Sequence, residues 1–334
     1  MRVVSIALAL LLWCGCSGQP AKEAPQPAEE SGPILLVSQK AAKSLAWYTL
    51  DGELLDEVAV SDHPHEIAGS ADGSRLFVTD NGVMQIENAG EGGNKVSIID
   101  IEARTRIGEV DLGQWHRPHG IDVCADGTLL VTTENPDQLL VIDIERRLVT
   151  KSHPTGGETP HIVHCSADST AAYVSNARSR TVSKIDIASG EHELLETGDR
   201  PEGSALNRDG SQLYVAHRDG NKIVVIDTAR WAVLGEISTP GSPVRCGLAG
   251  DDKTLVYGLI AGAVGFADVE SMQEVGRVEL VGPAVSLEMH DDVTALTCVQ
   301  DSDTCYVVSV PEQSILHTVK LHDGAGPDPA LLLE

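Results

Sequence analysis

The sequence predicts an all-β fold, a seven-bladed β-propeller of four-stranded antiparallel blades whose C-terminal strand joins the first blade and closes the ring. Three observations predict it. The apolar runs are short, evenly spaced and rich in Val and Ile, with no sustained helical periodicity. One motif recurs at a nearly constant interval. The first repeat lacks a strand, and a matching segment stands at the C-terminal end.

Residues 1–15 are expected to be a secretion signal. They carry one positive charge and an apolar run that is shorter than the about 20 residues a membrane-spanning helix needs. The segment LWCGC resembles the lipobox of bacterial lipoproteins, in which a cysteine carries lipid after cleavage. The resemblance implies lipidation at Cys16, because Gly15 is the small residue needed before the cut. Cys14 is the second candidate, since the bulky Trp13 precedes it. An ordinary cleaved signal with incidental cysteines is the alternative.

The resemblance implies a place in the bacterial cell envelope, on the periplasmic or extracellular face, with the membrane reached through the lipid anchor. Residues 16–32 are rich in Pro, Ala, Glu and Gln and show no apolar periodicity, so they are predicted to be a disordered tether. Residues 33–334 remain for the propeller, a length that suits one large β architecture.

Within residues 33–334, a repeat begins with a Pro-led strand and an Asp-containing turn, as in RPHGIDVCADG at residue 117 and RPEGSALNRDG at residue 200. Its turn aspartates are separated by 54, 42, 41, 42 and 40 residues. A period near 40–45 residues with four strands is typical of a propeller blade. These aspartates are Asp72, Asp126, Asp168, Asp209, Asp251 and Asp291.

The segments RLFVTDNG, AAYVSNARSRTVSKIDI and QLYVAHRDGNKIVVIDT resemble the YVTN-repeat β-propeller family. The resemblance extends over residues 63–310 and weakens beyond them. It implies the propeller fold and says almost nothing about activity.

The two ends of the repeat region are expected to share one blade. Residues 34–60 supply three strands without a Pro-led first strand, and GAGPDPALLLE at the C-terminal end supplies a segment of that type. Since an unpaired sheet edge invites aggregation, we expect this last segment to pair as the innermost strand of the first blade.

The one long interval contains DNGVMQIENAGEGGNKVSI, placed between the second and third strands of the second blade. Its tip is rich in glycine, and insertions on blade loops often carry binding features. Glu87 and Glu91 are expected to approach a cation or a basic partner. A tolerated surface elaboration is the alternative.

The strongest chemical signal lies seven residues before each turn aspartate, where the innermost strands line the axial channel. These positions are His65, His119, His161, Glu202, Val244 and Ala284, and Arg245 follows one of them. We expect a ligand-binding cluster of His65, His119, His161, Glu202 and Arg245 at the channel mouth. The alternative is a purely structural role, in which the imidazoles hold neighbouring blades in register.

Two enzymatic alternatives use the same residues. His65, His119 and His161 would suit copper, zinc or iron, because neutral imidazole is a common ligand of these metals. HPHEIAGSADGSRLFVTDNG resembles one stretch of the seven-bladed lactonase family, which implies a histidine general base with Arg245 or Arg200 near an oxyanion. That resemblance is confined to one blade, and whether the chain is an enzyme stays open.

Cysteine and charge patterns complete the expectations. Cys298 and Cys305 flank a predicted two-residue turn at 301–302 and are expected to form a disulfide. Cys124, Cys165 and Cys246 are expected to be small buried apolar residues.

With 24 basic and 50 acidic residues, the chain is a poor partner for nucleic acid. We expect a monomeric binding module for an unidentified protein or small molecule.

Overall fold

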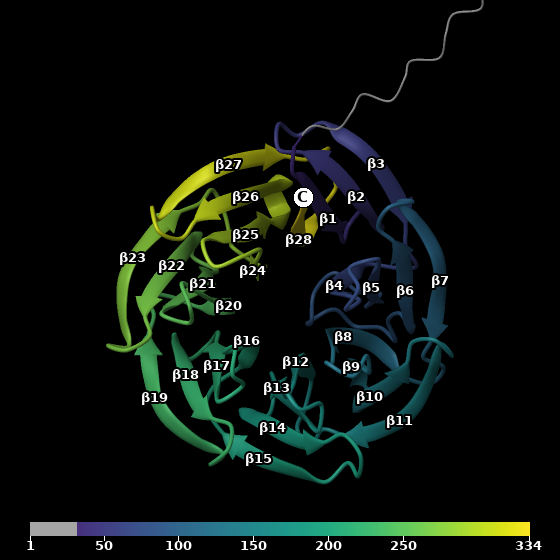
Figure 1. Ribbon diagram of the computed structural model, residues 1–334, viewed down its shortest axis with the longest axis vertical. Coiled ribbons are helices and arrows are strands. Elements are labelled where there is room, and N and C mark those ends of the chain that lie inside the picture. The colour runs from purple at the N-terminus through teal and green to yellow at the C-terminus, as the bar shows by residue number, and fades with distance from the viewer. Residues whose placement is uncertain (1–31) are drawn as a thin grey trace, which may run out of the picture. The chain divides into compact units, whose positions relative to one another are not determined.

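The computed structural model describes residues 32–334, which form a ring of seven four-stranded antiparallel sheets (Figure 1). This confirms the predicted all-β, seven-bladed propeller. The predicted signal peptide, the lipidation site Cys16 and the tether up to residue 31 lie outside the described residues. Among the residues described, no helix combines the length and the apolar character needed to cross a bilayer.

Blade 1 is built from both ends of the described chain, and blades 2 to 7 follow in chain order. The strands of each blade run from the innermost to the outermost in the order given. Blades 1 to 3 contain β28 (Pro327–Leu333), β1 (Ile34–Gln39), β2 (Ser44–Thr49) and β3 (Leu54–Ala59); β4 (Pro64–Gly69), β5 (Arg75–Asp80), β6 (Lys95–Asp100) and β7 (Thr105–Asp111); and β8 (His116–Val123), β9 (Leu129–Asn135), β10 (Asp137–Asp143) and β11 (Leu148–Pro154).

Blades 4 and 5 contain β12 (Pro160–Cys165), β13 (Ala171–Asn176), β14 (Thr181–Asp186) and β15 (His192–Glu196); and β16 (Pro201–Leu206), β17 (Gln212–His217), β18 (Lys222–Asp227) and β19 (Ala232–Ser238). Blades 6 and 7 contain β20 (Pro243–Ala249), β21 (Thr254–Leu259), β22 (Ala263–Asp268) and β23 (Gln273–Glu279); and β24 (Glu288–Met289), β25 (Thr294–Val299), β26 (Thr304–Ser309) and β27 (Ser314–Lys320), with a short 3-10 turn η1 (Gln300–Ser302) before β26.

The core consists of seven apolar clusters, one between each pair of adjacent blades. The two middle strands of a blade are buried on both faces because each face packs on a neighbouring blade, so their sequences are nearly continuous apolar runs. Outermost strands such as β23 alternate exposed and half-buried residues, as expected for a strand with one solvated face.

The ring closes as the sequence predicts. In β28, Ala330 pairs with Val37, Leu331 with Leu36 and Leu333 with Ile34, in an antiparallel register with β1. Ala330 also belongs to the apolar cluster between blades 7 and 1. The C-terminal strand therefore joins one blade by hydrogen bonds and the next by side-chain packing.

Blade 7 departs from the regular pattern. Its innermost strand is reduced to the two residues of β24, although the repeat predicts a strand from residue 282 onward. The backbone N–H of Ala284 instead donates to Leu259 of blade 6, and that of Val285 donates to Cys298. The segment thus divides its hydrogen bonds between two blades and forms no regular ladder.

The cysteines follow the sequence predictions only in part. Cys298 and Cys305 are directly opposite on β25 and β26 and form a disulfide, but the connection between their strands is four residues long and includes η1. The prediction that Cys124 and Cys165 are separate buried thiols is wrong, because they form a second disulfide. Cys124 directly follows β8 and Cys165 ends β12, the innermost strands of adjacent blades, and their Cα atoms are 5.4 Å apart. Cys246 is a free buried thiol.

Removing β28 is expected to destabilise the whole ring. Deletion of residues 327–334 would expose the β1 edge and the apolar face of blade 7, so the melting temperature should fall by at least about 10 °C and oligomers should appear. Differential scanning calorimetry and light scattering measure both effects, with deletion of the exposed Glu334 alone as the matched control. An equally stable monomer after the longer deletion would contradict this closure.

The two disulfides are expected to differ in their contribution to stability. Cys124 and Cys165 are separated by 41 residues and Cys298 and Cys305 by 7. Chain entropy then predicts that a double alanine substitution lowers the free energy of unfolding by about 4 kcal/mol for the first pair and about 2 kcal/mol for the second. Chemical denaturation of both double-alanine variants measures the two losses in the free energy of unfolding. A larger loss for the Cys298–Cys305 pair would contradict this prediction.

Candidate functional site at the channel axis

The structure brings the predicted channel residues together around the axis. His65, His119 and His161 come from the innermost strands β4, β8 and β12, and these residues are almost fully buried, with exposed fractions of 7, 2 and 4 %. The ring centroids of His65 and His119 are 4.1 Å apart, and those of His119 and His161 are 3.7 Å apart. Glu202 on β16 and Arg245 on β20 are also buried.

Threonine hydroxyls fix two of the three imidazole-bearing strands, β8 and β12, against the preceding blade. The Thr79 hydroxyl of blade 2 accepts from the Glu66 N–H at 3.0 Å and donates to the His119 carbonyl of blade 3 at 2.8 Å. The Thr132 hydroxyl of blade 3 donates in the same way to the His161 carbonyl of blade 4 at 2.7 Å. The backbone positions of these histidines are therefore set by inter-blade hydrogen bonds.

The glycine of the Pro-His-Gly segment at 118–120 and of the Pro-Glu-Gly segment at 201–203 allows adjacent innermost strands to approach closely. A Cβ added at Gly120 would lie 2.2 Å from the His161 carbonyl oxygen, and one at Gly203 would lie 2.3 Å from the Val244 carbonyl oxygen. Only glycine fits at such a distance. The motif therefore combines a structural residue with an adjacent side chain that reaches the channel.

A β-bulge follows the proline of each of these strands and changes which side chains reach the axis. The register of β4 shifts between Pro64 and Ile67, and that of β20 shifts between Pro243 and Arg245. A bulge re-aims side chains that strict alternation would place on opposite faces. Consequently Glu66, next to His65, belongs to the axial cluster as well.

His119 is a neutral imidazole bound on one side only. Burial, reinforced by His161 and His65, holds the pKa of His119 well below its usual range. Its Nδ1 lies 2.6 Å from Glu134, whose other oxygen lies 2.8 Å from Nε of Arg117. Burial raises the pKa of Glu134 to about 7, against the opposing effect of Arg117. Above that pH the Nδ1–H of the ring donates a hydrogen bond to the ionised carboxylate, and Nε2 carries no proton.

The other ring nitrogens of the three stacked histidines differ in whether they have a partner. Nδ1 of His65 lies 2.9 Å from Oδ2 of Asp328 and 3.6 Å from Oε1 of Glu66. In the described part of the chain, neither Nε2 of His119 nor Nδ1 of His161 has a hydrogen-bond partner, although both atoms are buried. Burial and the charge of Arg245 hold the pKa of His161 well below its usual range, so this ring is neutral too.

Buried ion pairs surround the imidazoles. Arg245 reaches from blade 6 to Glu66 of blade 2, with Nη2 2.5 Å from Oε1, and Lys40 lies 3.2 Å from Asp328. Burial opposes ionisation of Asp328, but His65 and Lys40 outweigh it and hold the pKa of Asp328 below its usual range. Each charge is thus compensated by a partner, as buried charges must be.

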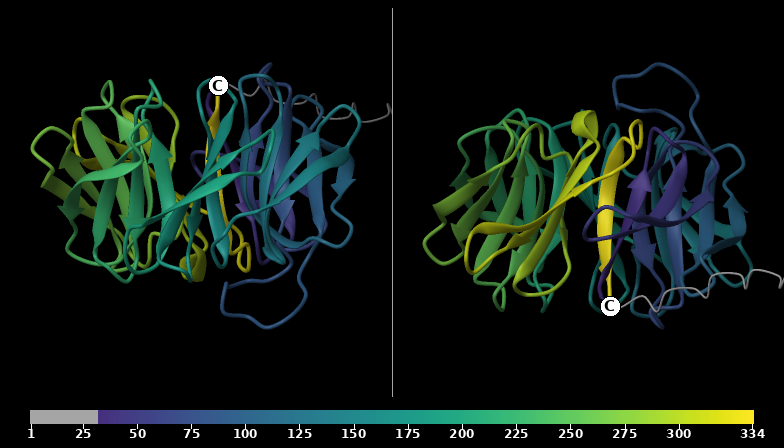
Figure 2. Two further views of the ribbon diagram at one scale, coloured as in Figure 1. Left: turned by 90° about the horizontal axis from the view of Figure 1, so that it is seen from below. Right: turned by 90° about the horizontal axis from the view of Figure 1, so that it is seen from above.

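The 81–94 loop, the predicted insertion between β5 and β6, covers one end of this cluster. In Figure 2 it is the blue segment that projects from the face opposite the C-terminus. Its Ile86 carbonyl accepts from Arg117 at 3.0 Å and from Arg178 at 3.3 Å, and Glu87 pairs with Arg200 at 2.7 Å. Glu91 lies 3.4 Å from His116. The loop therefore extends from blade 2 to blades 3, 4 and 5.

A small cavity of about 80 Å³ lies under this loop. Met84, Gln85 and Ile86 of the loop line it, and Glu202 is paired in its wall with Arg200 at 2.5 Å and with Arg218 at 3.4 Å. The remaining lining side chains that carry charge or imidazole are Lys40, His65, His161, Arg218, Arg245 and Asp328.

The other end of the channel has a larger cavity of about 400 Å³. Arg245 and Glu66 line it together with His164 and Glu288, so Arg245 contributes to both cavities. Burial, together with Glu66, raises the pKa of Glu288 to about 8. His164 is held by the Ser204 carbonyl at 2.8 Å and is not part of the imidazole stack.

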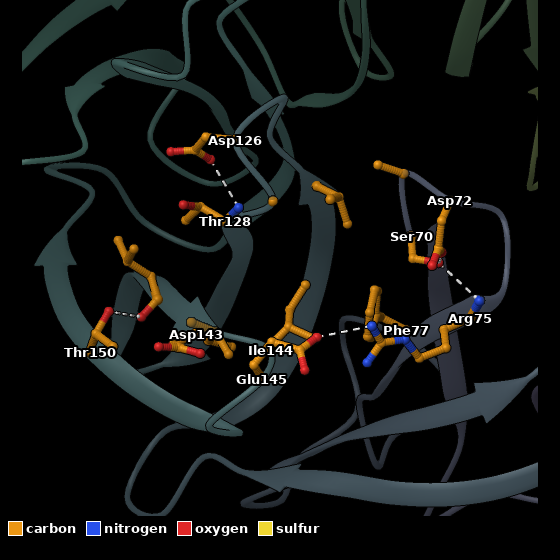
Figure 3. A pocket seen from close by; sticks show the side chains of 15 residues that line it. Ser70, Asp72, Arg75, Phe77, Asp126, Thr128, Asp143, Ile144, Glu145 and Thr150 are labelled. Carbon is orange, nitrogen blue, oxygen red and sulfur yellow. Dashed lines mark hydrogen bonds and ion pairs between the residues drawn. The ribbon is translucent and has the colours of Figure 1, made fainter.

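A cavity of about 620 Å³ between blades 2 and 3 lies away from the axis (Figure 3). Its carboxylates are occupied by structural hydrogen bonds: Asp72 accepts from Ser70 and Ser74, and Asp126 accepts from the Thr128 N–H. Arg75 is paired with Glu145 at 2.9 Å. The polar residues of this cavity therefore serve the turns of the repeat, and we assign no ligand to it.

Sequence reasoning missed four members of the axial cluster, namely Lys40, Glu66, Glu134 and Asp328. A signal for Asp328 was present, because Pro327-Asp328 repeats the Pro-x register of Pro64-His65 and Pro118-His119 in the shared blade. Glu66 required knowledge of the bulge. Lys40 and Glu134 lie outside the innermost strands, so the repeat register does not indicate them.

No protein-family model matches the chain, and no curated protein matches it either. Solved structures do. Kuenenia stuttgartiensis hydrazine synthase matches with a TM-score of 0.65 and 20 % identity over 86 % of this chain and 92 % of that chain. A functionally unknown protein from Desulfotomaculum acetoxidans matches with a TM-score of 0.72 and 15 % identity over 90 % of this chain and 99 % of the other. At these identities the matches establish the seven-bladed propeller fold alone.

Proposed function

We propose that this chain is an exported, lipid-anchored propeller of the YVTN type that binds a small anionic ligand in the cavity between the axial cluster and the 81–94 loop. The observation that carries the proposal is the enclosure of a polar cavity by a loop that other blades hold in place. Binding sites in such folds are commonly built by loops on a rigid scaffold.

The cavity's charge favours an anion. Lys40, Arg218 and Arg245 contribute three cationic groups, and Glu202 and Asp328 contribute two anionic groups. His161 is neutral. Glu66, the partner of Arg245, and Arg200, a partner of Glu202, are not lining residues, and their opposite charges cancel. Without counting His65, the lining therefore has an excess of one positive charge before any ligand enters.

The cavity's size restricts the ligand to a few non-hydrogen atoms. Its volume of about 80 Å³ corresponds to two or three water molecules at about 30 Å³ each. A small carboxylate such as formate or acetate fits this volume and the excess charge.

A ligand can enter the cavity when the 81–94 loop is displaced. Its links to the neighbouring blades are hydrogen bonds and side-chain pairs. They include bonds from arginine side chains to the Ile86 and Asn88 carbonyls, a bond from Gln85 to Gln300, and the pairs of Glu87 with Arg200 and of Glu91 with His116. More than half of the Glu87 side chain is exposed, and such pairs contribute about 1 kcal/mol or less. Displacement of the loop is therefore inexpensive compared with opening a blade.

Two disulfides support the exported location, because disulfides persist mainly in oxidising compartments. A lactonase-like activity has less support. The guanidinium groups of Arg245 and Arg200, which that activity would place near an oxyanion, are paired with Glu66, Glu87 and Glu202.

Formate and acetate are expected to bind with one site per chain, measured by isothermal titration calorimetry on the metal-free full-length protein. Substitution Arg218→Met removes a cation from the cavity wall and should weaken binding at least about tenfold, because a hydrogen bond to a charged group contributes about 1.5–3 kcal/mol.

The exposed Arg230 provides the matched control, since Arg230→Met should leave the affinity unchanged. Failure of both anions to bind at millimolar concentration, or equal binding by the Arg218→Met protein, would refute the proposal.

A further inference from the structure

We infer that His65, Glu66 and His119 form a binding site for a divalent first-row transition metal ion at the axis of the propeller. The inference rests on the proposed binding role of this end of the channel, and it names an ion that would hold the anionic ligand. It revises the donor set expected from the repeat, which contained His161 in place of Glu66.

The donor atoms converge. One ligand atom from each of His65, Glu66 and His119 lies within 4.8 Å of the other two. Three atoms at such separations leave a central point within about 2.8 Å of each, and bond lengths of about 2.0–2.2 Å require each side chain to shift by less than about 1 Å. Two imidazoles and one carboxylate on one side of an ion leave positions open for a further ligand.

His119 is prepared for this role. Its Nε2 is buried and has no hydrogen-bond partner in the described part of the chain, while its Nδ1 contacts Glu134. His65 is held by Asp328, which lies 2.9 Å from its Nδ1, and the same Nδ1 lies 3.6 Å from Glu66 Oε1. A carboxylate on the far nitrogen of a histidine fixes the ring and strengthens it as a metal ligand. An unpaired buried nitrogen is otherwise costly, so a bound ion would satisfy it.

The two histidines and Glu66 come together for reasons of backbone structure. The bulge at the start of β4 directs His65 and the adjacent Glu66 toward the axis. Thr79 holds the Glu66 N–H and the His119 carbonyl through the same hydroxyl. The three donors therefore rest on strands of a rigid scaffold, which is what a preorganised site requires.

Arg245 must give up its contact with Glu66. Its Nη2 is 2.5 Å from Glu66 Oε1, so an ion at the site would take this oxygen from the guanidinium. The carboxylates of Asp328 and Glu202 also act electrostatically on Arg245 and offer it alternative partners. A dication next to Arg245 and Lys40 would further favour an anion in the adjacent cavity, since His65 lines that cavity.

Electron paramagnetic resonance of the full-length protein with one equivalent of Cu²⁺ tests this donor set. We expect a single species with coupling to two nitrogens, which falls to one nitrogen in His65→Asn and in His119→Asn. His161→Asn should retain two nitrogens, and His217→Asn, which removes a buried histidine elsewhere, should also retain two. Glu134→Gln should weaken Co²⁺ binding, measured by its visible absorption, by about 10-fold or more.

Because a histidine variant can fail to fold, each variant is compared with wild type by circular dichroism, and Glu66→Gln provides a variant of equal size. Coupling to three nitrogens that depends on His161, unchanged spectra in His65→Asn and His119→Asn, or Co²⁺ affinity unaffected by Glu66→Gln would overturn the inference. Formate binding by a protein that fails to take up one equivalent of Cu²⁺ or Co²⁺ would refute the metal site alone. Metal binding without any effect of formate or acetate would refute the anion-binding function alone.

Discussion

β28 pairs with β1, and this contact between the two ends of the described chain determines what reaches the axis. It completes blade 1, covers the apolar face of blade 7 and carries Asp328 to within 2.9 Å of His65. A strand supplied by the C-terminal end thus contributes both to closure of the fold and to the polarity of the channel. The position of every other innermost strand depends on the ring remaining closed.

The axis of this propeller is unusually polar for a buried region. A well-packed apolar axis would avoid the cost of removing Lys40, Glu66, Arg245 and Asp328 from water, and replacing buried ion pairs by apolar residues is often neutral or stabilising. The ion pairs compensate the charges, but Nε2 of His119 and Nδ1 of His161 stay unpaired among the described residues. Perturbed pKa values and unsatisfied polar atoms concentrated in one place are typical of functional sites rather than of stabilising cores.

The sequence was sufficient to predict the fold because each blade repeats the same local instructions: a Pro-led strand, an Asp-containing turn and apolar strands of constant spacing. The same register placed His65, His119 and His161 at equivalent positions. It could not reveal Glu66, because a bulge breaks the two-residue alternation on which the prediction relied. Nor could it pair Cys124 with Cys165, since their proximity arises from two blades meeting rather than from one turn. Arg245 was recognised, but its contact with Glu66 across the channel follows only from the closed ring.

The central claim is that the ring holds His119 as a neutral imidazole with a free Nε2. A group whose pKa is lowered by folding favours the folded state above its ordinary pKa, and this contribution falls as the pH drops below about 6.5. The most direct measurement is long-range ¹H–¹⁵N correlation of histidine side chains in the metal-free protein between pH 5 and 8. We expect a neutral His119 ring throughout this range, with the Nδ1–H tautomer above about pH 7, where Glu134 is ionised. A ring that becomes an imidazolium near pH 6.5, or that carries its proton on Nε2 at pH 8, would contradict the account.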